Sequence, residues 1–304
     1  MRNFTFKGLF LAIVFIVLGS LSIQAADDDG LITRQVTIKL EKAGTLPNKI
    51  GSTKKFQITN LKIIGEINGT DLHMIREMAG KDARGNDTDG MLSVLDLSDA
   101  KIVEGGCYNI NGCLYSTSND KIGDNAFCDC SGLTSLTLPS GVTEIGNSAF
   151  RDCSGLTSLT LPSGVTKIDD YAFEDCSGLT SMTLPASVTF LSSYALKGCS
   201  GLASIYVYTE KLPDMGRDVF DGCDAKKCTV YVPKGTYDDY WLSEFGYFEN
   251  IVEFEATGIN NVITSNDAKE HSRYSVNGQR LSAPTKGLNI VKYSDGSVKK
   301  VAVQ

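Results

Sequence analysis

Hydrophobic residues recur along the middle of the chain in a fixed order, with nearly the same polar residues between them. Three blocks of the pattern C-S-G-L-T-S-x-T-L-P align without a gap and begin at Cys130, Cys153 and Cys176, and a fourth block, one residue longer, begins at Cys199. The period is 23 residues. One unit of this length cannot bury its own apolar side chains, so neighbouring units must stack and share a core. The pattern therefore predicts a solenoid.

Within each unit, the segment L-x-x-L-x-L predicts a short strand, because apolar positions alternate and threonine is frequent. Stacked copies would form a parallel sheet with rungs about 4.8 Å apart and leucines pointing inward. Pro139, Pro162 and Pro185 would end the strands, because proline has no N–H for the ladder. The stretch from Ile145 to Phe150 predicts a short helical or irregular return limb.

The repeat resembles the leucine-rich repeats of the BspA-like surface proteins of anaerobic commensal bacteria, over about residues 121–222. Residues 95–102 look like a divergent leading repeat, residues 43–72 resemble the N-terminal region of such proteins, and residues 231–235 resemble their terminating unit. The resemblance implies an α/β-type solenoid, a leucine-rich repeat fold with a parallel β-sheet on one face. It also implies a secreted or surface-exposed protein that binds other macromolecules, without saying which.

The N-terminus has the features of an export signal. Arg2 and Lys7 precede an apolar run over residues 9–21, and the small residues Ala25 and Ala26 follow. The run is short for a membrane span of about 20 residues, although an N-terminal anchor helix is the alternative. We expect residues 1–25 to be a signal peptide, the mature chain to have no transmembrane segment, and the protein to be secreted or attached to the cell surface.

The rest of the chain is expected to divide into four parts. A flanking or capping region over residues 27–90 precedes the solenoid of residues 91–228, whose clearest repeats lie within 121–222, and a C-terminal cap over residues 229–255 follows it. Residues 256–304 predict a small antiparallel β module.

That last module is predicted from three strand-like runs at residues 274–276, 288–293 and 298–303, separated by the turn signals Asn277-Gly278 and Asp295-Gly296. A polar linker, residues 256–273, precedes them. Residues 274–280 resemble C-terminal sorting domains of exported proteins in the same bacteria, which implies a module that routes or attaches the chain to the outer surface, with or without cleavage. The alternative is a stabilising appendage.

Nine cysteines in an exported chain would ordinarily indicate disulfides. Neighbouring rungs would bring cysteines of one column within Cα distance of a disulfide, roughly 4.4–6.8 Å, but stacked side chains point the same way and do not converge. We therefore expect a ladder of buried thiols, formed by Cys130, Cys153, Cys176, Cys199 and Cys223. The states of Cys107, Cys113, Cys128 and Cys228 stay open, and a Cys107–Cys113 bond inside an insertion at residues 105–119 is one alternative.

Composition argues against several classes of function. The chain of 304 residues has a net charge of −7, so it lacks the basic stripe that binds nucleic acid. Of its two histidines, His73 lies in a helix predicted at residues 70–79 and His271 lies in the polar linker, and neither has an evident partner for acid–base chemistry. No hydrolase, zinc or phosphate-loop motif is present. We expect no enzyme activity, no cofactor and no metal site.

The outward positions of the strands are the candidate binding surface. They carry small hydroxyl residues and then tyrosines: Ser135, Thr137, Ser158, Thr160, Ser181, Thr183, Ser204, Tyr206 and Tyr208. Threonine and serine at these positions have a structural interpretation, since they suit paired strands. They also suit a flat polar surface for a glycan or an extended polypeptide. The aromatic residues from Tyr206 onward are either contact residues or a cap over the last rung.

We accordingly predict a non-catalytic, monomeric repeat protein that binds a protein or glycan partner, such as an adhesin. The alternative is a structural spacer with no ligand on the repeat face.

Overall fold

The computed structural model describes residues 30–110, 112–209 and 211–254 in full, and four strands between residues 270 and 303 as backbone. The predicted signal peptide at residues 1–25 and the two turn signals of the C-terminal module lie outside the described residues.

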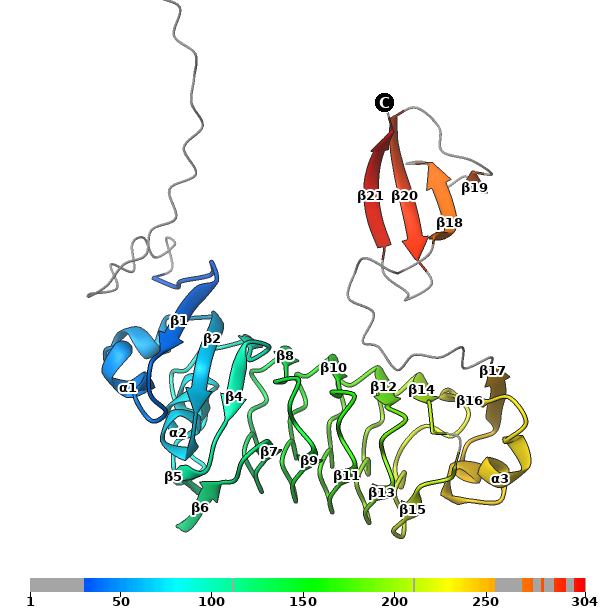
Figure 1. Ribbon diagram of the computed structural model, residues 1–304, viewed down its shortest axis with the longest axis horizontal. Coiled ribbons are helices and arrows are strands. Elements are labelled where there is room, and N and C mark those ends of the chain that lie inside the picture. Colours follow the sequence, from blue (N-terminus) through cyan, green and yellow to red (C-terminus); the bar gives the residue numbers. More distant parts are fainter. Residues whose placement is uncertain are drawn as a thin grey trace, which may run out of the picture.

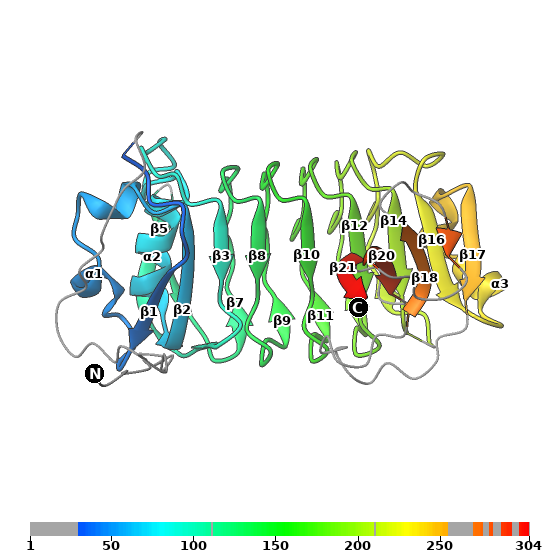
Figure 2. The ribbon, with the colours of Figure 1, turned by 90° about the horizontal axis from the view of Figure 1, so that it is seen from above.

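A ten-stranded parallel sheet runs along the whole elongated body (Figures 1 and 2). Its strands, in spatial order, are β1 (Val36–Leu40), β2 (Asn60–Ile67), β3 (Val94–Asp96), β8 (Ser135–Thr137), β10 (Ser158–Thr160), β12 (Ser181–Leu184), β14 (Ser204–Val207), β16 (Thr229–Pro233) and β17 (Asn250–Phe254), with β4 (Ala100–Ile102) beside β2. The repeats pair in step, so that Leu136, Leu159 and Met182 are neighbours. The predicted leucine-rich repeat solenoid is confirmed.

A second, narrower parallel sheet, which the sequence did not predict, lies where the return limbs begin, and the limbs take the irregular form, one of the two alternatives expected. It consists of β7 (Lys121–Ile122), β9 (Glu144–Ile145), β11 (Lys167–Ile168), β13 (Phe190–Leu191) and β15 (Asp214–Met215). The limb from Ile145 to Phe150 contains no helix and continues from its strand as turns. Ser148 in this limb and Asp152 just after it have φ of 51° and 58°. These left-handed residues prevent a helix from propagating.

The core lies between these two sheets. Leucines of the large sheet point into it, and Phe127, Phe150 and Phe173 stack along it with ring centroids 5.4 and 5.2 Å apart. Because each aromatic ring packs on the ring of the next unit, the stack extends the in-register pairing of the strands into the core.

The N-terminal part supplies the first rungs and covers them with helices α1 (Leu46–Lys49), η1 (Lys54–Phe56) and α2 (Gly69–Met78). The predicted helix at residues 70–79 corresponds to α2. Asn68 and Asp71 form a capping box at its start, and the buried Asp71 carboxylate also accepts the backbone N–H of Leu46 at 2.9 Å. The insertion at residues 105–119 is a hairpin of β5 (Gly105–Ile110) and β6 (Cys113–Thr117).

At the other end, β16 and β17 add two rungs beyond the four clearest repeats, and α3 (Tyr237–Trp241) and η2 (Glu244–Tyr247) follow (Figure 1). Tyr240, Phe245 and Phe248 are buried, and both phenylalanine rings contact Phe220 at 5.0 Å. Some aromatic residues of this segment therefore do close the core.

The C-terminal module is a four-stranded antiparallel sheet. Its strands are β18 (Glu270–Ser275), β19 (Arg280–Leu281), β20 (Gly287–Tyr293) and β21 (Val298–Val303), in the order β19-β18-β20-β21. The sequence predicted three strands and missed β19, which is only two residues long. Strand β18 begins within the expected polar linker and includes His271, and its mostly polar sequence carries no hydrophobic run that would have marked it.

Candidate functional site

The outer face, defined here as the outward side chains of the large sheet, consists of two rows that run along the solenoid. One row carries Asn60, Val94, Ser135, Ser158, Ser181, Ser204, Thr229 and Asn250, and the other carries Lys62, Asp96, Thr137, Thr160, Thr183, Tyr206, Tyr231 and Val252. Thr137, Ser158 and Thr160 are exposed. The other predicted face residues, Ser135, Ser181, Thr183, Ser204, Tyr206 and Tyr208, are half-buried.

Aromatic side chains gather where the hydroxyl rows end. Tyr206 stacks on Tyr231 with centroids 4.6 Å apart, and Tyr208 meets Phe254 edge to face at 5.2 Å. We call these four residues the aromatic patch. Burial raises the pKa of both Tyr206 and Tyr208 above the ordinary tyrosine value, which extends to higher pH the range over which their hydroxyl groups donate hydrogen bonds. Phe254 was missed from the sequence, because it lies beyond the repeat pattern.

A groove of about 570 Å³ adjoins the aromatic patch at Tyr208. Its floor and walls come from the third and fourth units: Ala186, Val188, Thr189, Tyr208, Thr209, Lys211, Leu212, Pro213 and Asp214. Lys211 and Asp214 are exposed, and they offer a cation and an anion beside the apolar Leu212. The sequence carried a signal for this groove, since the fourth unit is one residue longer than the others and lacks the proline that ends the strand segment in the first three.

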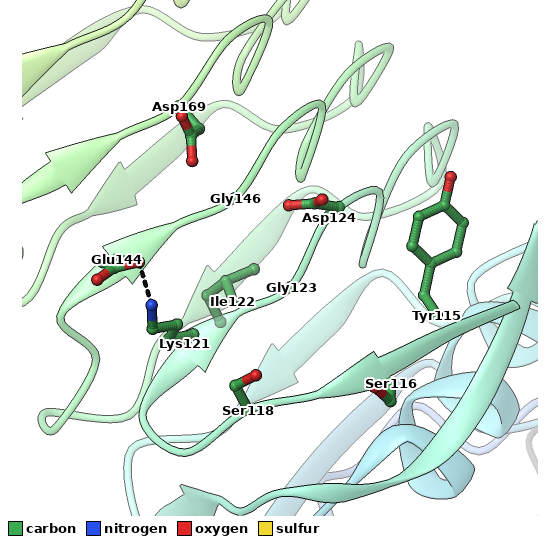
Figure 3. Close-up of a pocket in the computed structure, with 10 residues that line it drawn as sticks. All are labelled: Tyr115, Ser116, Ser118, Lys121, Ile122, Gly123, Asp124, Glu144, Gly146 and Asp169. Atoms are coloured by element: carbon green, nitrogen blue, oxygen red, sulfur yellow. Dashed lines mark hydrogen bonds and ion pairs between the residues drawn. The ribbon is translucent and has the colours of Figure 1, made fainter.

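A second cavity, of about 300 Å³, lies between β6 and the first strands of the narrow sheet (Figure 3). It contains three carboxylates, but each already has a partner. Glu144 pairs with Lys121, Asp124 accepts the Asn147 N–H at 3.0 Å, and Asp169 lies 3.0 Å from the Lys167 amine. Among the described residues, no group of three His, Cys, Asp or Glu side chains could hold a metal ion.

The two histidines lie on different elements. His73 lies on α2 with its Nε2 atom 4.0 Å from Glu77, and His271 lies on β18. No helix in the described part of the chain is long and apolar enough to cross a membrane.

The predicted cysteine column lies in the core, and its thiols donate to carbonyl oxygens of the preceding unit. Cys153 donates to Phe127 at 3.0 Å, Cys176 to Phe150 and Cys199 to Phe173 both at 3.1 Å, and Cys223 to Leu196 at 3.3 Å. All five thiols of the column are free and buried.

The surroundings of these thiols make them poor nucleophiles. Burial raises the pKa of Cys130 to about 11 and that of Cys223 to about 12. Burial also raises the pKa of Cys153, and a hydrogen bond with Cys176 together with burial raises that of Cys199. Because the thiolate is the reactive form, these raised pKa values keep the thiols unreactive at neutral pH, and we propose a structural role for the column.

Arg76 occupies the start of the column, beside Cys130, the first of its five cysteines. Its Nη1 donates to the carbonyl oxygens of Cys128 at 2.9 Å and Asn125 at 3.2 Å, and lies 3.9 Å from the Cys130 sulfur. The side chain is fully buried, and its Nε and Nη2 have no partner within the described residues. The guanidinium thus covers the first turn of the stack. Sequence reasoning missed it, because an arginine on a helix ordinarily indicates a surface position.

The remaining four cysteines are also free. On the hairpin, Cys107 lies opposite Ser116 and Cys113 opposite Ile110, so two residue pairs lie between their positions and the two side chains lie on opposite faces. The alternative Cys107–Cys113 bond is therefore not formed, and both thiols are exposed. Cys128 and Cys228 are buried, and burial raises the pKa of each to about 12.

Comparison with known proteins identifies the repeat. Residues 105–235 match the model of the BspA type leucine-rich repeat region in six copies. No curated protein matches the chain.

Several solved structures are similar to it. A leucine-rich repeat protein of T. pallidum is 24% identical over 45% of this chain and 64% of its own, with a TM-score of 0.37. The pneumococcal vaccine antigen PcpA is 14% identical over 73% and 68%, with a TM-score of 0.37. A leucine-rich repeat protein of Bacteroides ovatus is 19% identical over 73% and 66%, with a TM-score of 0.36. The chain thus spans less than two thirds of the T. pallidum and B. ovatus proteins.

Proposed function

We propose, from the premise that residues 105–235 make this chain a BspA-like leucine-rich repeat protein, that it is an exported binding protein without catalytic activity. It acts at the cell surface or after secretion and holds a macromolecular partner, a protein or a glycan, as an adhesin does. The single observation that carries this proposal is the aromatic patch, which lies beside a groove at the end of the hydroxyl rows.

The chemistry of the patch supports contact with a partner. Tyrosine combines a large apolar ring with a hydroxyl group, and for that reason it is frequent at binding surfaces. The Tyr206 and Tyr208 rings are half-buried and held by neighbouring rings, so little side-chain entropy is lost when a partner covers them. Lys211 and Asp214 in the groove add both signs of charge for orienting polar groups.

Export is supported by the sequence of residues 1–25, with its basic start, apolar run and small residues at the expected cleavage site. The C-terminal β module, residues 256–304, is proposed to attach the chain to the outer surface.

The test is binding to a panel of matrix proteins and glycans by a Tyr206→Ala, Tyr208→Ala double variant. A matched control removes another stacked pair, Tyr171 and Tyr194, whose centroids are 5.0 Å apart on the return limbs. Both have positive φ, so asparagine is the suitable replacement there. We expect the patch variant to weaken binding by about 2 kcal/mol or more and the control to bind as wild type. Equal binding by both variants would remove the patch from the site.

One observation favours a spacer as the second candidate function. Between Ser135 and Thr183 the outer face repeats serine and threonine with no variety, and such rows are sufficiently explained by their pairing across strands. If no member of the panel binds the wild-type protein, the spacer is the better description.

A further inference from the structure

We propose that copies of this protein associate end to end, with the C-terminal end of one solenoid against the N-terminal end of the next. The two ends of the large sheet are formed by β1 and β17, each five residues long. Edge strands present backbone N–H and C=O groups that a further strand can pair with. The proposal is independent of the binding function above, because it uses the ends of the sheet and leaves the outer face free.

The direction of the strands favours head-to-tail contact. Every neighbouring pair in the large sheet is parallel, from β1 with β2 to β16 with β17. A second copy placed with its β1 beside β17 therefore continues the sheet with the same strand direction and the same axis. Contact between two β17 strands, or two β1 strands, would instead reverse the direction of the second copy.

The charges of the two ends are opposite. Residues 36–59, which form the N-terminal end, contain five lysines and one glutamate, whereas residues 234–254, which form the C-terminal end, contain five carboxylates and one lysine. Head-to-tail contact joins opposite charges, while contact between identical ends joins like charges and is disfavoured.

Most of these charges are available to a partner. Asp238, Asp239, Glu244, Glu249 and Glu253 are exposed, and none forms an ion pair within the described part of the chain. At the other end Lys55 is held by Glu77, and Lys39 by Glu41, but Lys42, Lys49 and Lys54 form no ion pair among the residues described.

The charged residues stand on elements at the two extremes of the body. Figures 1 and 2 both place α1, which carries Lys49, at one extreme and α3, which carries Asp238 and Asp239, at the other. Beside these carboxylates, Leu242 is 84% exposed and Trp241 is 45% exposed. An end that combines exposed apolar side chains with unpaired charge is suited to a complementary protein surface.

Such a contact joins two different surfaces, so it does not close into a dimer and can extend into linear arrays. This departs from the monomer expected from the sequence. The association should be weak and sensitive to salt, because exposed charges are screened beyond about 8 Å at physiological ionic strength.

The test uses the chain expressed from residue 26, which retains every described residue, and measures sedimentation velocity over a wide range of concentration at low and high salt. One variant neutralises the C-terminal end, with Asp238→Asn and Asp239→Asn. A second neutralises the N-terminal end, with Lys42→Gln and Lys49→Gln. A matched control neutralises two exposed carboxylates elsewhere, with Asp89→Asn and Glu104→Gln.

We expect the wild type and the control to associate with rising concentration at low salt. Each end variant alone should associate about tenfold more weakly, given up to about 1 kcal/mol for each exposed ion pair. An equimolar mixture of the two variants should form dimers and nothing larger, because it contains one intact contact: the lysine end of the first variant with the carboxylate end of the second.

Three results would overturn the proposal. The wild type could stay monomeric at every concentration at low salt. The two variants could fail to associate when mixed. The variant with Lys42→Gln and Lys49→Gln could associate as strongly as the wild type. The carboxylate end would then bind something other than the lysine end, such as the basic C-terminal module of a second copy.

Discussion

Tyr206 lies flat on Tyr231, with ring planes 7° from parallel and centroids 4.6 Å apart. At the equivalent position the three preceding strands carry threonine, which pairs in the same row. We therefore expect Tyr206→Thr to fold normally and to lose about 1 kcal/mol of stability, the usual value of an aromatic pair. Chemical denaturation measures this. A loss of several kcal/mol would mean that the ring is part of the cap over the core.

The exposure of the cysteines predicts a thiol count. Only Cys107 and Cys113 are exposed, and all nine cysteines are free. Without reductant, a thiol reagent should label two thiols in the folded protein and nine after unfolding. Mass mapping should place the two fast labels on the hairpin. Fewer than five thiols in the unfolded protein would show that the buried column is oxidised.

The raised thiol pKa values predict loss of stability at alkaline pH. In the folded protein the pKa of Cys228 rises from 9.0 to about 12. Above about pH 9 the unfolded chain releases this proton while the folded chain retains it, so the free energy of unfolding falls as the pH rises towards 12.

Each such thiol contributes a slope of at most about 1.4 kcal/mol per pH unit. Denaturation of the wild type and of Cys228→Ala between pH 8 and 11 isolates one of them, and the variant should have the shallower slope. Parallel curves for the two proteins would contradict the assignment.

The burial of Arg76 predicts that its replacement destabilises the protein much more than replacement of an exposed arginine does. Arg76→Ala removes the guanidinium donor of the buried Cys128 carbonyl oxygen and one of the two donors of the Asn125 carbonyl oxygen, and it opens a cavity, so we expect a loss of about 3 kcal/mol or more. The control is Arg151→Ala, because the Arg151 side chain is 43% exposed and forms a surface ion pair with Asp152, so the expected loss is about 1 kcal/mol or less. Thermal unfolding compares them, and similar losses would show that Arg76 does not hold the first turn.

The large sheet was predictable from the sequence because its signal is repeated. Leu136, Leu159 and Met182 occupy one position at a spacing of 23 residues, and that spacing determines which residues become neighbours. The narrow sheet was not predictable, because two-residue strands such as Glu144–Ile145 are too short to show alternation. Its hydrogen bonds follow from the stacking of whole units.

The candidate site could be predicted from the sequence only in part. Tyr206 follows from the register of the strands, whereas the contact of Tyr208 with Phe254 joins residues 46 positions apart and outside any common pattern. Arg76 had no sequence signal at all, since its partners are backbone carbonyls about 50 residues away, and backbone groups are the same for every residue.

Hydrogen-bonded residues of neighbouring units are a constant number of positions apart in the sequence, and this has a consequence for how the gene can gain or lose repeats. Thr157 donates to Thr134, and Thr180 donates to Thr157, each across 23 residues. The thiols of Cys153, Cys176 and Cys199 donate across 26 residues in the same way. Removal or duplication of one unit brings equivalent atoms together again. Recombination between the nearly identical coding blocks can therefore lengthen or shorten the protein in steps of about 4.8 Å without creating a new packing problem.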